Sequence, residues 1–566
     1  MTAALESISL YRELESELTG PDGPFALASA QVRGESMQVY RDAPAGLDAV
    51  FGELVEAYSD NVFLIEGGVE YSYREVADNA ARLAGALVSE YSIGTGSRVG
   101  VLMKNQLAYV VSIVAIARCG AAAVLFNSRE SIAEIGHALA DADCAVVIAD
   151  DKRARLARSA GSGARLLVVG DEPLDGSTRL YREVMSGTFD PPAPVSVDPE
   201  SLCLILFTSG TSGRSKGVLL TQRNVCTMVM NLRMIKEINI HTNARKYGME
   251  PDALRGLMPS LSALLIFPLF HTSGLVSLLT SLTSGGFVVI QDRWSAEGAI
   301  ELIAKHKLAM LAGPPMVITD LLATNPEPEA VASLVNVAPA GQATPPDLVD
   351  RISQMLPGAG RSVGWGMTEA AGSVCTAGGD LLAAYPDSSG PASPVMSVRA
   401  VGADGTVLPA GEVGELEIRG PLVMVGYLDR PAETAAVFDG SWYRSGDLGY
   451  LDKSGLVFVV DRKKDMVISA GENIYCAEVE HALMASDKFA EVTVFGVPDD
   501  RRGEVVVAAV APREGEILTE QQVQDIVRGS LAEYKVPTAV AFDLAPFPRN
   551  ATGKILKRKV REQYSS

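Results

Sequence analysis

A glycine- and hydroxyl-rich loop follows an apolar run in the first half of the chain, and it constrains the fold more than any other feature. The run Leu202–Phe207 predicts a buried strand, and the stretch Phe207–Gly217 reads FTSGTSGRSKG. Glycines let backbone N–H groups converge on an anion, hydroxyls donate to its oxygens, and cations such as Arg214 and Lys216 neutralise its charge. A loop of this kind is more often a flexible surface turn. Here three further segments supply what a nucleotide site needs, which favours a polyphosphate cradle.

The residues of this loop exclude two common phosphate-binding patterns. Lys216 is preceded by Ser215 and followed by Gly217, which does not fit the Walker A pattern. The loop contains no GxGxxG, so a kinase-like or dinucleotide-binding interpretation loses its main support.

The segment Gly364–Gly372, GWGMTEAAG, brings an aromatic ring and a carboxylate close together. Trp365 offers a flat face on which a purine stacks. Glu369 is a natural Mg²⁺ ligand beside a phosphate site, because this hard ion prefers oxygen donors. Taken alone, a Trp–Gly step is more often a packed turn, and an isolated Glu is usually solvated.

Two segments nearer the C-terminus carry further charged groups. In Tyr443–Glu480 a turn at Asp452–Gly455 joins two apolar runs, which predicts a hairpin, and Asp447 lies in a turn where a carboxylate can hold two ribose hydroxyls. The cluster DRKKD that follows is ordinarily a solvated loop, although its place before a glycine-rich turn suits a hinge. In Pro548–Val560, PRNATGKILKRKV, Lys554 begins a basic stretch. Such a stretch is usually only solvated charge, but here it is a locally positive segment in an acidic protein.

Together these four segments resemble the adenylate-forming superfamily, which contains acyl-CoA synthetases, luciferases and nonribosomal peptide adenylation domains. The resemblance runs from about Tyr40 to Val560, and FTSGTSGRSKG, GWGMTEA, SGDLG, DRKKD and NATGK follow in the family order. It implies ATP, Mg²⁺, CoA and a small-molecule carboxylic acid as ligands.

The resemblance also implies catalytic roles. Lys554 would bridge the substrate carboxylate and the α-phosphate, Thr368 would contact the adenylate phosphate, and Glu369 would bind Mg²⁺. His271, in PLFHTSG, would act as a gate near the acyl pocket, whereas without the motif context it is more often a core histidine satisfied by the backbone.

The other positions carried over from the family bind nucleotide, CoA and the acyl group. Trp365 would stack on adenine, Asp447 would hold the ribose with Arg462 beside it, and Lys464 would be the hinge. The phosphate loop would comprise Thr208, Ser209, Gly210, Thr211, Ser212, Gly213 and Lys216. CoA would pass Ser469, Ala470 and Gly471, and the acyl pocket would include Ala340, Gly341, Gln342 and Gly364.

The chain departs from the family pattern in four places. Ser215 replaces a common proline, Trp365 stands where tyrosine is more usual, and Cys476 replaces a frequent proline. With tryptophan, stacking survives but any contact through a tyrosine hydroxyl is lost. The stretch Arg233–Ser260 is longer than expected, which indicates a surface excursion or a segment that shapes the acyl entrance.

Composition narrows the class of protein. A net charge of −20 argues against nucleic acid as the main partner, and anionic ligands must be attracted by local cations. Six cysteines without a CxxC pair disfavour zinc and disulfides and favour a reducing, cytoplasmic setting, and no signal peptide is evident. Ser262–Ile290 lacks charged residues, but its prolines, glycines and hydroxyls favour two buried elements over a membrane span. A homodimer is left open.

The periodicity predicts an α/β fold. Helical patterns at Ser7–Leu18, Ala49–Tyr58 and Tyr73–Tyr91 alternate, from the second onward, with short apolar runs, which predicts helix-covered parallel sheets. A β-rich subdomain is expected over Val395–Val460, and a small α+β lid follows, with a helix at Glu520–Leu531. Predicted strands are Val99–Met103, Ala121–Leu125, Ala145–Ala149, Leu166–Val169, Val492–Val497 and Val505–Ala511. The expected domains are residues 1–463, which bind AMP, and residues 464–566, the mobile lid.

The resemblance favours an acyl-CoA synthetase that acts in two steps. A carboxylate attacks the α-phosphate of ATP to give an acyl-adenylate and pyrophosphate, and a thiol then takes the acyl group as AMP leaves. A fatty or other hydrophobic acid is the expected substrate. The alternatives are an acyl-AMP ligase that loads a separate carrier protein, oxidation of the adenylate as in luciferases, and a nucleotide-binding regulator without catalysis, against which Glu369 and Lys554 speak.

Overall fold

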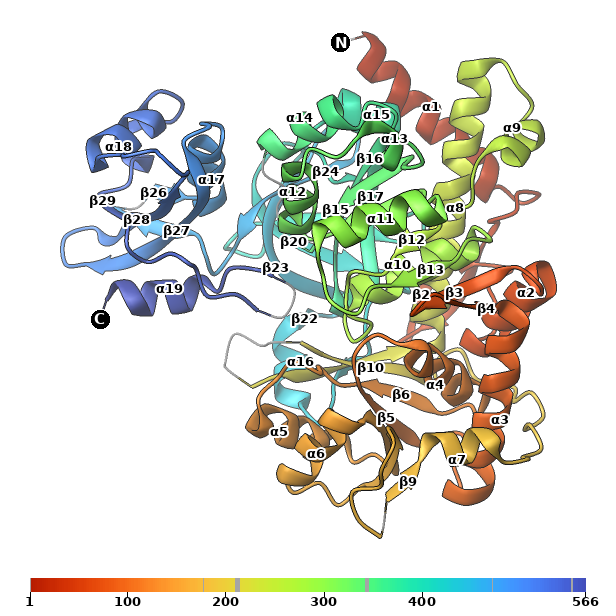
Figure 1. The fold of residues 1–566 in the computed structure, drawn as a ribbon. Coiled ribbons are helices and arrows are strands. Elements are labelled where there is room, and N and C mark those ends of the chain that lie inside the picture. Colours follow the sequence, from red (N-terminus) through yellow and green to blue (C-terminus); the bar gives the residue numbers. More distant parts are fainter. Residues whose placement is uncertain are drawn as a thin grey trace.

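A computed structural model describes residues 2–176, 178–208, 214–341, 346–470, 472–550 and 553–565. The chain forms two large sheets that share segments from several parts of the sequence, a smaller β-rich sheet and a C-terminal α+β unit (Figure 1). The fold class expected from the sequence is confirmed.

The first large sheet carries the phosphate loop. Its strand order is β21-β11-β10-β6-β5-β7-β8-β9, with the central pairs parallel. In β10 the side chains of Leu204 and Leu206 enter one core and those of Ile205 and Phe207 enter another, because successive strand residues face opposite sides. The strands are β5 (Arg98–Leu102), β6 (Ala122–Leu125), β7 (Val146–Asp150), β8 (Arg165–Val169), β9 (Thr178–Leu180), β10 (Leu202–Thr208), β11 (Lys216–Thr221) and β21 (Gly426–Tyr427).

Helices cover both faces of this sheet, as expected from the alternation of elements. On one face α5 and α6 pack against the core that holds Ile205 and Phe207. On the other face α2, α3, α4, α8 and α10 share one core that also reaches the second sheet. These helices are α2 (Leu47–Tyr58), α3 (Tyr73–Tyr91), α4 (Leu107–Arg118), α5 (Ile132–Ala142), α6 (Asp151–Ser159), α8 (Gln222–Tyr247) and α10 (Thr272–Thr283), with the short α7 (Tyr181–Ser186) preceding the extended connector to β10.

The second large sheet has the order β17-β16-β15-β14-β12-β13-β3-β4. Its outer face is covered by α11, α12 and α14, whose apolar side chains pack on Leu264, Leu311 and Val337. The strands are β3 (Val62–Glu66), β4 (Val69–Ser72), β12 (Ala263–Leu264), β13 (Val288–Ile290), β14 (Met310–Gly313), β15 (Asn336–Pro339), β16 (Gly360–Met367) and β17 (Gly372–Gly378). The helices are α11 (Ala296–His306), α12 (Pro315–Ala323), α13 (Pro328–Val331), α14 (Pro346–Met355), α15 (Gly379–Ala384) and the 3₁₀ turn η1 (Thr368–Ala370).

The stretch Arg233–Ser260 is largely helical rather than a surface loop. Helix α8 begins with a capping box between Thr221 and Asn224 and runs 26 residues to Gly248, whose φ of 64° ends it, and α9 (Pro251–Leu257) follows. The sequence patterns predicted no helix here, because the helix has buried residues on several sides and so a weak apolar periodicity. The uncharged stretch Ser262–Ile290 folds as β12, α10 and β13. No described helix is long and apolar enough to cross a membrane.

The β-rich subdomain and the C-terminal unit complete the chain. The hairpin turn predicted at Asp452–Gly455 is confirmed: Asp452 Oδ1 accepts from the backbone N–H groups of Ser454 and Leu456, both at 2.9 Å. The subdomain contains β18 (Gly390–Pro391), β19 (Ser397–Val401), β20 (Gly414–Arg419), β22 (Phe438–Asp439), β23 (Trp442–Leu451), β24 (Leu456–Arg462) and α16 (Pro431–Val437). The C-terminal unit contains β25 (Val467–Ser469), β26 (Glu472–Ile474), β27 (Phe489–Asp499), β28 (Gly503–Pro512), β29 (Ala539–Ala541), α17 (Cys476–Met484), α18 (Glu520–Arg528), η2 (Glu533–Lys535) and α19 (Lys557–Tyr564).

The N-terminal region adds elements that the sequence patterns did not fully predict. Helix α1 (Thr2–Thr19) is longer than the expected Ser7–Leu18, and the hairpin of β1 (Leu27–Val32) and β2 (Glu35–Tyr40) was not expected at all. At the tip of that hairpin Arg33 has a φ of 51° and reaches toward the β-rich subdomain.

Candidate active site

The phosphate-loop strand and its return strand place the first site residues. Thr208 ends β10 and pairs with Lys216, which begins β11. Lys216 Nζ forms an ion pair with Glu433 Oε2 at 2.6 Å and lies 4.9 Å from the centre of the Tyr427 ring. The predicted loop residues Ser209, Gly210, Thr211, Ser212 and Gly213 lie outside the described residues. The cation of the motif is thus held beside the loop by residues that the motif does not contain.

Glu369 is half-buried near this cation. It lies in η1, between β16 and β17, immediately after Thr368. Its Oε1 accepts a hydrogen bond from the Tyr427 hydroxyl at 3.0 Å, and its carbonyl oxygen accepts from the backbone N–H of Met424 at 2.8 Å. Burial raises the pKa of Glu369, while the Tyr427 hydrogen bond and the positive charges of Arg462 and Lys216 oppose that rise.

The surroundings of Glu369 suit a Mg²⁺ ion that arrives with a nucleotide. Such an ion is usually bound through one or two carboxylates together with substrate phosphates. Within the described ranges, no three His, Cys, Asp or Glu side chains gather into a group that holds a metal by itself. A half-buried carboxylate near Lys216 therefore fits a metal whose remaining ligands are phosphate oxygens and water.

Asp447 is held by two side chains from different strands. It lies on β23 and is only 3% exposed, directly opposite Arg462 on β24. Arg462 Nε forms an ion pair with Asp447 Oδ1 at 2.7 Å, and Trp365 Nε1 on β16 donates to Asp447 Oδ2 at 2.7 Å. Three residues that the sequence assigned to one nucleotide therefore lie in direct contact, although they come from three separate strands.

Lys554 projects from a tight turn of the C-terminal unit. Asn550 Oδ1 accepts from the Lys554 backbone N–H, and the Asn550 N–H donates to the Lys554 carbonyl, both at 2.9 Å. Burial lowers the pKa of Lys554 to about 8, assisted by the positive charges of Arg462 and Lys464 and opposed by Asp465 and Asp447. These charged neighbours place Lys554 near the cluster of Asp447, Arg462 and Trp365. This cluster is called the Asp447 corner.

The positions proposed for the hinge and for CoA lie on the C-terminal side of that corner. Lys464 is in the turn between β24 and β25. Ser469 pairs with Gly503, and Ala470, whose φ is 51°, donates its N–H to the carbonyl of Arg502 at 2.8 Å. Gly471 lies outside the described residues. Ser469 and Ala470 thus contact their own domain, whereas Lys554 contacts the nucleotide corner.

The residues expected around the acyl group are less closely gathered. His271 is the residue before α10, and burial lowers its pKa to about 4, with a contribution from the Arg129 charge. Its Nε2 is buried without a hydrogen-bond partner among the described residues. Ala340 and Gly341 follow β15, and a Cβ on Gly341 would lie 3.5 Å from the ring of Phe267. Gln342 lies outside the described residues.

Gly364 has a packing reason to be glycine. A Cβ at this position would lie 3.0 Å from the carbonyl oxygen of Cys375, on the neighbouring strand β17. That separation is tighter than ordinary van der Waals contact, so β17 approaches β16 closely only because the side chain is absent. The place of Gly364 in the acyl pocket stays a prediction.

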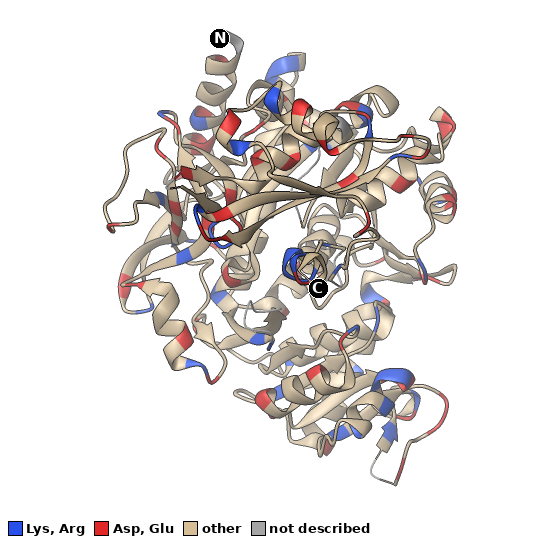
Figure 2. Cartoon of the chain, turned by 90° about the vertical axis from the view of Figure 1, so that its left-hand side faces the viewer, with Lys and Arg blue, Asp and Glu red and all other residues tan. Residues whose placement is uncertain are grey.

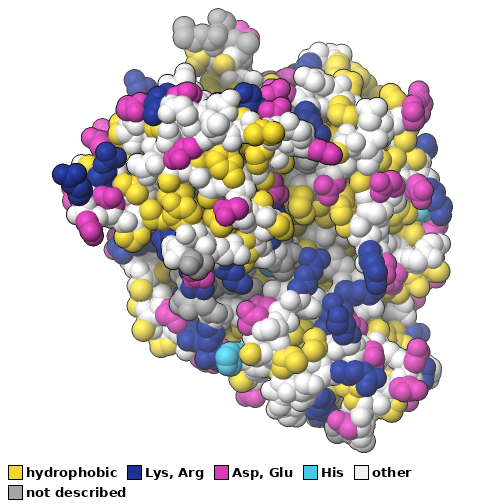
Figure 3. Space-filling view, turned by 60° about the vertical axis from the view of Figure 1, so that its left-hand side comes forward, with side chains coloured by type: hydrophobic (Ala, Val, Ile, Leu, Met, Phe, Trp, Pro, Cys, Tyr) yellow, Lys and Arg dark blue, Asp and Glu magenta, His cyan; other side chains and the backbone are white. Residues whose placement is uncertain are grey.

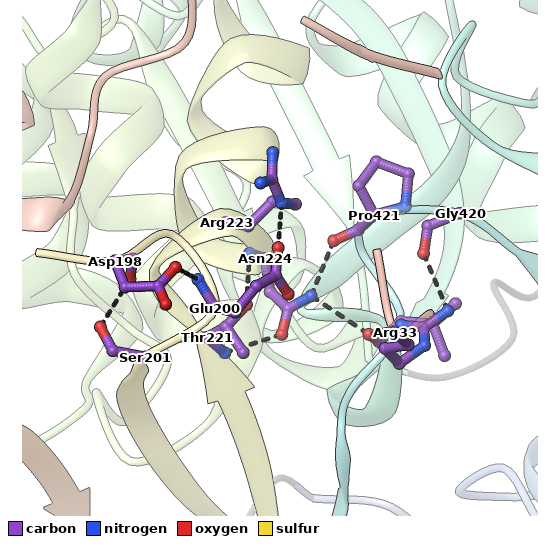
Figure 4. Close-up of polar contacts among 10 residues, drawn as sticks. Arg33, Asp198, Glu200, Ser201, Thr221, Arg223, Asn224, Gly420 and Pro421 are labelled. Carbon is purple, nitrogen blue, oxygen red and sulfur yellow. Dashed lines mark hydrogen bonds and ion pairs between the residues drawn. The ribbon is translucent and has the colours of Figure 1, made fainter. Parts of the chain in front are cut away.

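The sequence did not predict a set of hydrogen bonds that holds the segment next to Glu369. Arg33 and Asn224 both donate to carbonyl oxygens of the segment Gly420–Val423 (Figure 4). Asn224 Nδ2 bonds the carbonyls of Pro421 at 2.7 Å and Val423 at 3.1 Å. The next residue, Met424, is the one whose N–H bonds the Glu369 carbonyl. Only the capping pattern TxxN at the start of α8 offered a local signal.

The charge distribution agrees with a site for anionic ligands in an acidic protein. Figure 2 shows Lys and Arg interspersed with Asp and Glu over most elements. Figure 3 shows Lys and Arg side chains gathered beside the hollow between the upper part of the molecule and the lower lobe. Local cations thus offset the net charge of −20 where a polyphosphate would enter.

Comparison with known proteins shows which families this chain matches. Residues 51–428 match the AMP-binding enzyme family, and residues 478–554 match the AMP-binding enzyme C-terminal domain. Feruloyl-CoA synthase of an Amycolatopsis species is 33% identical over 501 residues, which cover 88% of this chain and 95% of that protein. A methyl-dioxo-octahydroindenyl-propanoyl:CoA ligase of Mycobacterium tuberculosis is 32% identical, and the match covers 92% of this chain and 99% of that protein.

Solved structures give the same result. O-succinylbenzoate coenzyme A synthetase of Bacillus subtilis, in complex with ATP and magnesium ion, superposes with a TM-score of 0.74 at 26% identity and covers 90% of this chain and 98% of that one. The matches extend over both the large N-terminal domain and the small C-terminal domain. The chain therefore belongs to the AMP-binding enzyme family and is an AMP-forming acid–thiol ligase that activates a carboxylic acid.

Proposed function

We propose that this ligase joins a hydrophobic carboxylic acid to CoA through an acyl-adenylate and releases AMP and pyrophosphate. The observation that carries the proposal is the convergence of Glu369, Asp447, Arg462 and Lys554. These residues come from three distant parts of the chain, yet Arg462 and Asp447 form an ion pair and both are charged neighbours of Lys554. Such convergence supports one site that serves a single nucleotide.

In the first step a carboxylate attacks the α-phosphate, and both reactants are anionic. The Lys554 ammonium offsets their repulsion, and Glu369 holds the Mg²⁺ that neutralises phosphate charge. Lys216 exchanges its ion pair with Glu433 for the phosphates, because a polyphosphate presents more negative charge than one carboxylate. Asp447 and Arg462 orient the ribose, which keeps the α-phosphorus in line with the attacking oxygen.

In the second step a thiolate displaces AMP from the acyl carbon. The C-terminal domain turns about Lys464, withdraws Lys554 and brings Ser469, Ala470 and Gly471 toward the adenylate; hinged closure of this kind is a known structural device. The relatives named for CoA favour CoA as acceptor over a carrier protein.

The acyl group is proposed to be bulky and apolar. His271 stays uncharged near neutral pH because its pKa is about 4, so it faces the acyl group as a neutral ring. The relatives named for a feruloyl group and for an octahydroindenyl propanoyl group act on ring-bearing acids, which supports aromatic, polycyclic or long-chain acids.

A two-stage assay tests the proposal. Pyrophosphate release is measured with ATP, Mg²⁺ and a panel of cinnamic, polycyclic and long-chain acids, beside acetate and malonate as polar controls. CoA is then added and the thioester is sought by mass spectrometry, in parallel with a phosphopantetheinylated carrier protein. Preference for acetate or malonate contradicts the hydrophobic substrate, and acyl transfer to the carrier alone supports the acyl-AMP ligase instead.

A further inference from the structure

The indole N–H of Trp365 is engaged in a way that adenine stacking does not explain. Trp365 and Asp447 are 82 residues apart, yet Nε1 donates to Asp447 Oδ2 at 2.7 Å, and the two residues are 7% and 3% exposed. A hydrogen bond from a neutral donor to a buried carboxylate is stronger than one between neutral groups and fixes the orientation of the acceptor. This contact depends on tryptophan, because a phenyl ring at the same place carries no donor.

The second oxygen of Asp447 is held by another donor. Arg462 Nε forms the ion pair with Oδ1 at 2.7 Å, so each carboxylate oxygen receives one donor from a different strand. A carboxylate has about four acceptor positions, two on each oxygen. Counting the donors of the described residues, one acceptor position remains on each oxygen, and both positions belong to a group whose rotation is blocked. That arrangement matches two neighbouring hydroxyl donors, such as the diol of a ribose.

We propose that Trp365 is the positioning residue of Asp447, and that its indole N–H sets the preference of this ligase for a ribonucleotide over a deoxyribonucleotide. The inference rests on the proposed nucleotide site and deepens it. The indole holds Oδ2, Arg462 holds Oδ1, and the carboxylate accepts both ribose hydroxyls without first reorganising. Loss of the indole donor frees the carboxylate to rotate, which weakens the acceptance of two hydroxyls at once but leaves contacts to the base and phosphates in place.

Nucleotide binding to the full-length protein tests this inference without knowledge of the acid substrate. Titration calorimetry compares ATP, 2′-deoxy-ATP and 3′-deoxy-ATP on the wild-type protein and on Trp365→Phe, which keeps an aromatic face. The wild type is expected to bind ATP about tenfold more tightly than either deoxy analogue, the ratio that 1.4 kcal/mol represents. In Trp365→Phe the dissociation constant for ATP rises toward those of the analogues, which change little, so the preference falls to about twofold or less.

The chain offers a matched control. Trp294 Nε1 donates to Asp320 Oδ2 at 3.2 Å, a second indole–carboxylate hydrogen bond that lies in the layer of α11 and α12. Trp294→Phe removes the same kind of bond away from Asp447 and should leave the preference for ATP unchanged. If Trp365→Phe does not fold, 3-benzothienylalanine at position 365 replaces the indole N–H with sulfur at nearly unchanged shape and gives the same comparison.

The outcomes separate this inference from the proposed function. Equal weakening of all three nucleotides in Trp365→Phe assigns Trp365 to stacking or packing and overturns the inference, while the nucleotide site stands. An unchanged preference in a folded variant overturns it as well. Failure of the wild type to bind ATP in the presence of Mg²⁺ overturns both the inference and the proposed function.

Discussion

The corner around Asp447 and the turn around Lys554 contribute to the same site in opposite ways. Asp447 lies on a central strand of its sheet, and each of its carboxylate oxygens is held by a side chain from another strand. Lys554 lies in a turn closed by Asn550, and the charges of Arg462 and Asp447 act on it. The first corner is built to keep one geometry, whereas the second belongs to a separate unit that needs no such rigidity.

This difference matches the chemistry of two steps at one site. The nucleotide must stay in place from adenylation to thioester formation, so its ribose contacts belong on fixed strands. In the proposed function the lysine acts only while the α-phosphate is attacked, which suits a place on a domain that turns away. If the comparison is correct, a change at Lys554 affects adenylation alone, whereas a change at Asp447 affects both half-reactions.

The largest effect is expected from Lys554→Ala. Loss of the ammonium removes the charge that offsets repulsion between carboxylate and phosphate, and adenylation should slow by about 10²–10³-fold. Thioester formation from supplied acyl-adenylate and CoA should stay near the wild-type rate. Rapid-quench measurement of each half-reaction checks this. An equal fall in the rates of adenylation and thioester formation would show that Lys554 is not specific to the first step. Lys554 and Asp447 would then not differ in the steps they serve.

Asp447→Ala should affect both half-reactions, because both need the adenosine moiety bound. Two hydrogen bonds to a charged acceptor are lost, at about 1.5–3 kcal/mol each when fully formed, with part regained from water. We expect the KM for ATP to rise about 10–100-fold with a smaller change in kcat. Unchanged dependence on ATP concentration would remove Asp447 from the ribose.

The pH dependence of adenylation should report on Lys554. Its pKa is about 8, so the ammonium is present below that pH and is lost above it. For the free enzyme, kcat/KM for adenylation should therefore decline above pH 8 by about tenfold per unit. In Lys554→Arg the guanidinium stays charged, so the decline should disappear although the rate is lower. Persistence of the same decline in that variant would assign it to another group.

The smallest effect on the reaction is expected from Asn224, whose side chain holds the segment next to Glu369. Asn224→Ala removes two hydrogen bonds to the segment that holds the Glu369 carbonyl; the Val423 carbonyl keeps its bond from Arg33, whereas the Pro421 carbonyl loses the Asn224 donor. The free energy of unfolding should fall by about 1–3 kcal/mol, measured by urea denaturation. Asn243→Ala, which loses one exposed bond to Asn239 later in α8, serves as control. A fall in both variants of the same size would show that Asn224 does not fix the site.

Much of the fold was accessible from the sequence, because apolar periodicity marks each buried strand and helix locally. Strands β5, β6, β7 and β8 were predicted to within one residue at each end, and the hairpin at Asp452 was predicted from its turn residues. Helix α8 was not predicted, since a helix buried on several sides loses the single apolar stripe on which such predictions depend.

The candidate site was partly predictable for the same reason. Glu369, Asp447 and Lys554 each stand in a short motif whose residue types reveal their chemistry without neighbours. Tyr427, Glu433 and Arg33 stand in no such motif, and their contacts with Glu369, Lys216 and the segment Gly420–Val423 arise only when distant strands come together.

The sequence by itself determined the class of reaction through its resemblance to the adenylate-forming superfamily, because the motifs that carry this resemblance are short local patterns in a fixed order. Only the tertiary structure decided how the residues of those motifs are held. The bond from Trp365 to Asp447 spans 82 residues and two sheets, and no local pattern encodes it, since it exists only where β16 and β23 pack together.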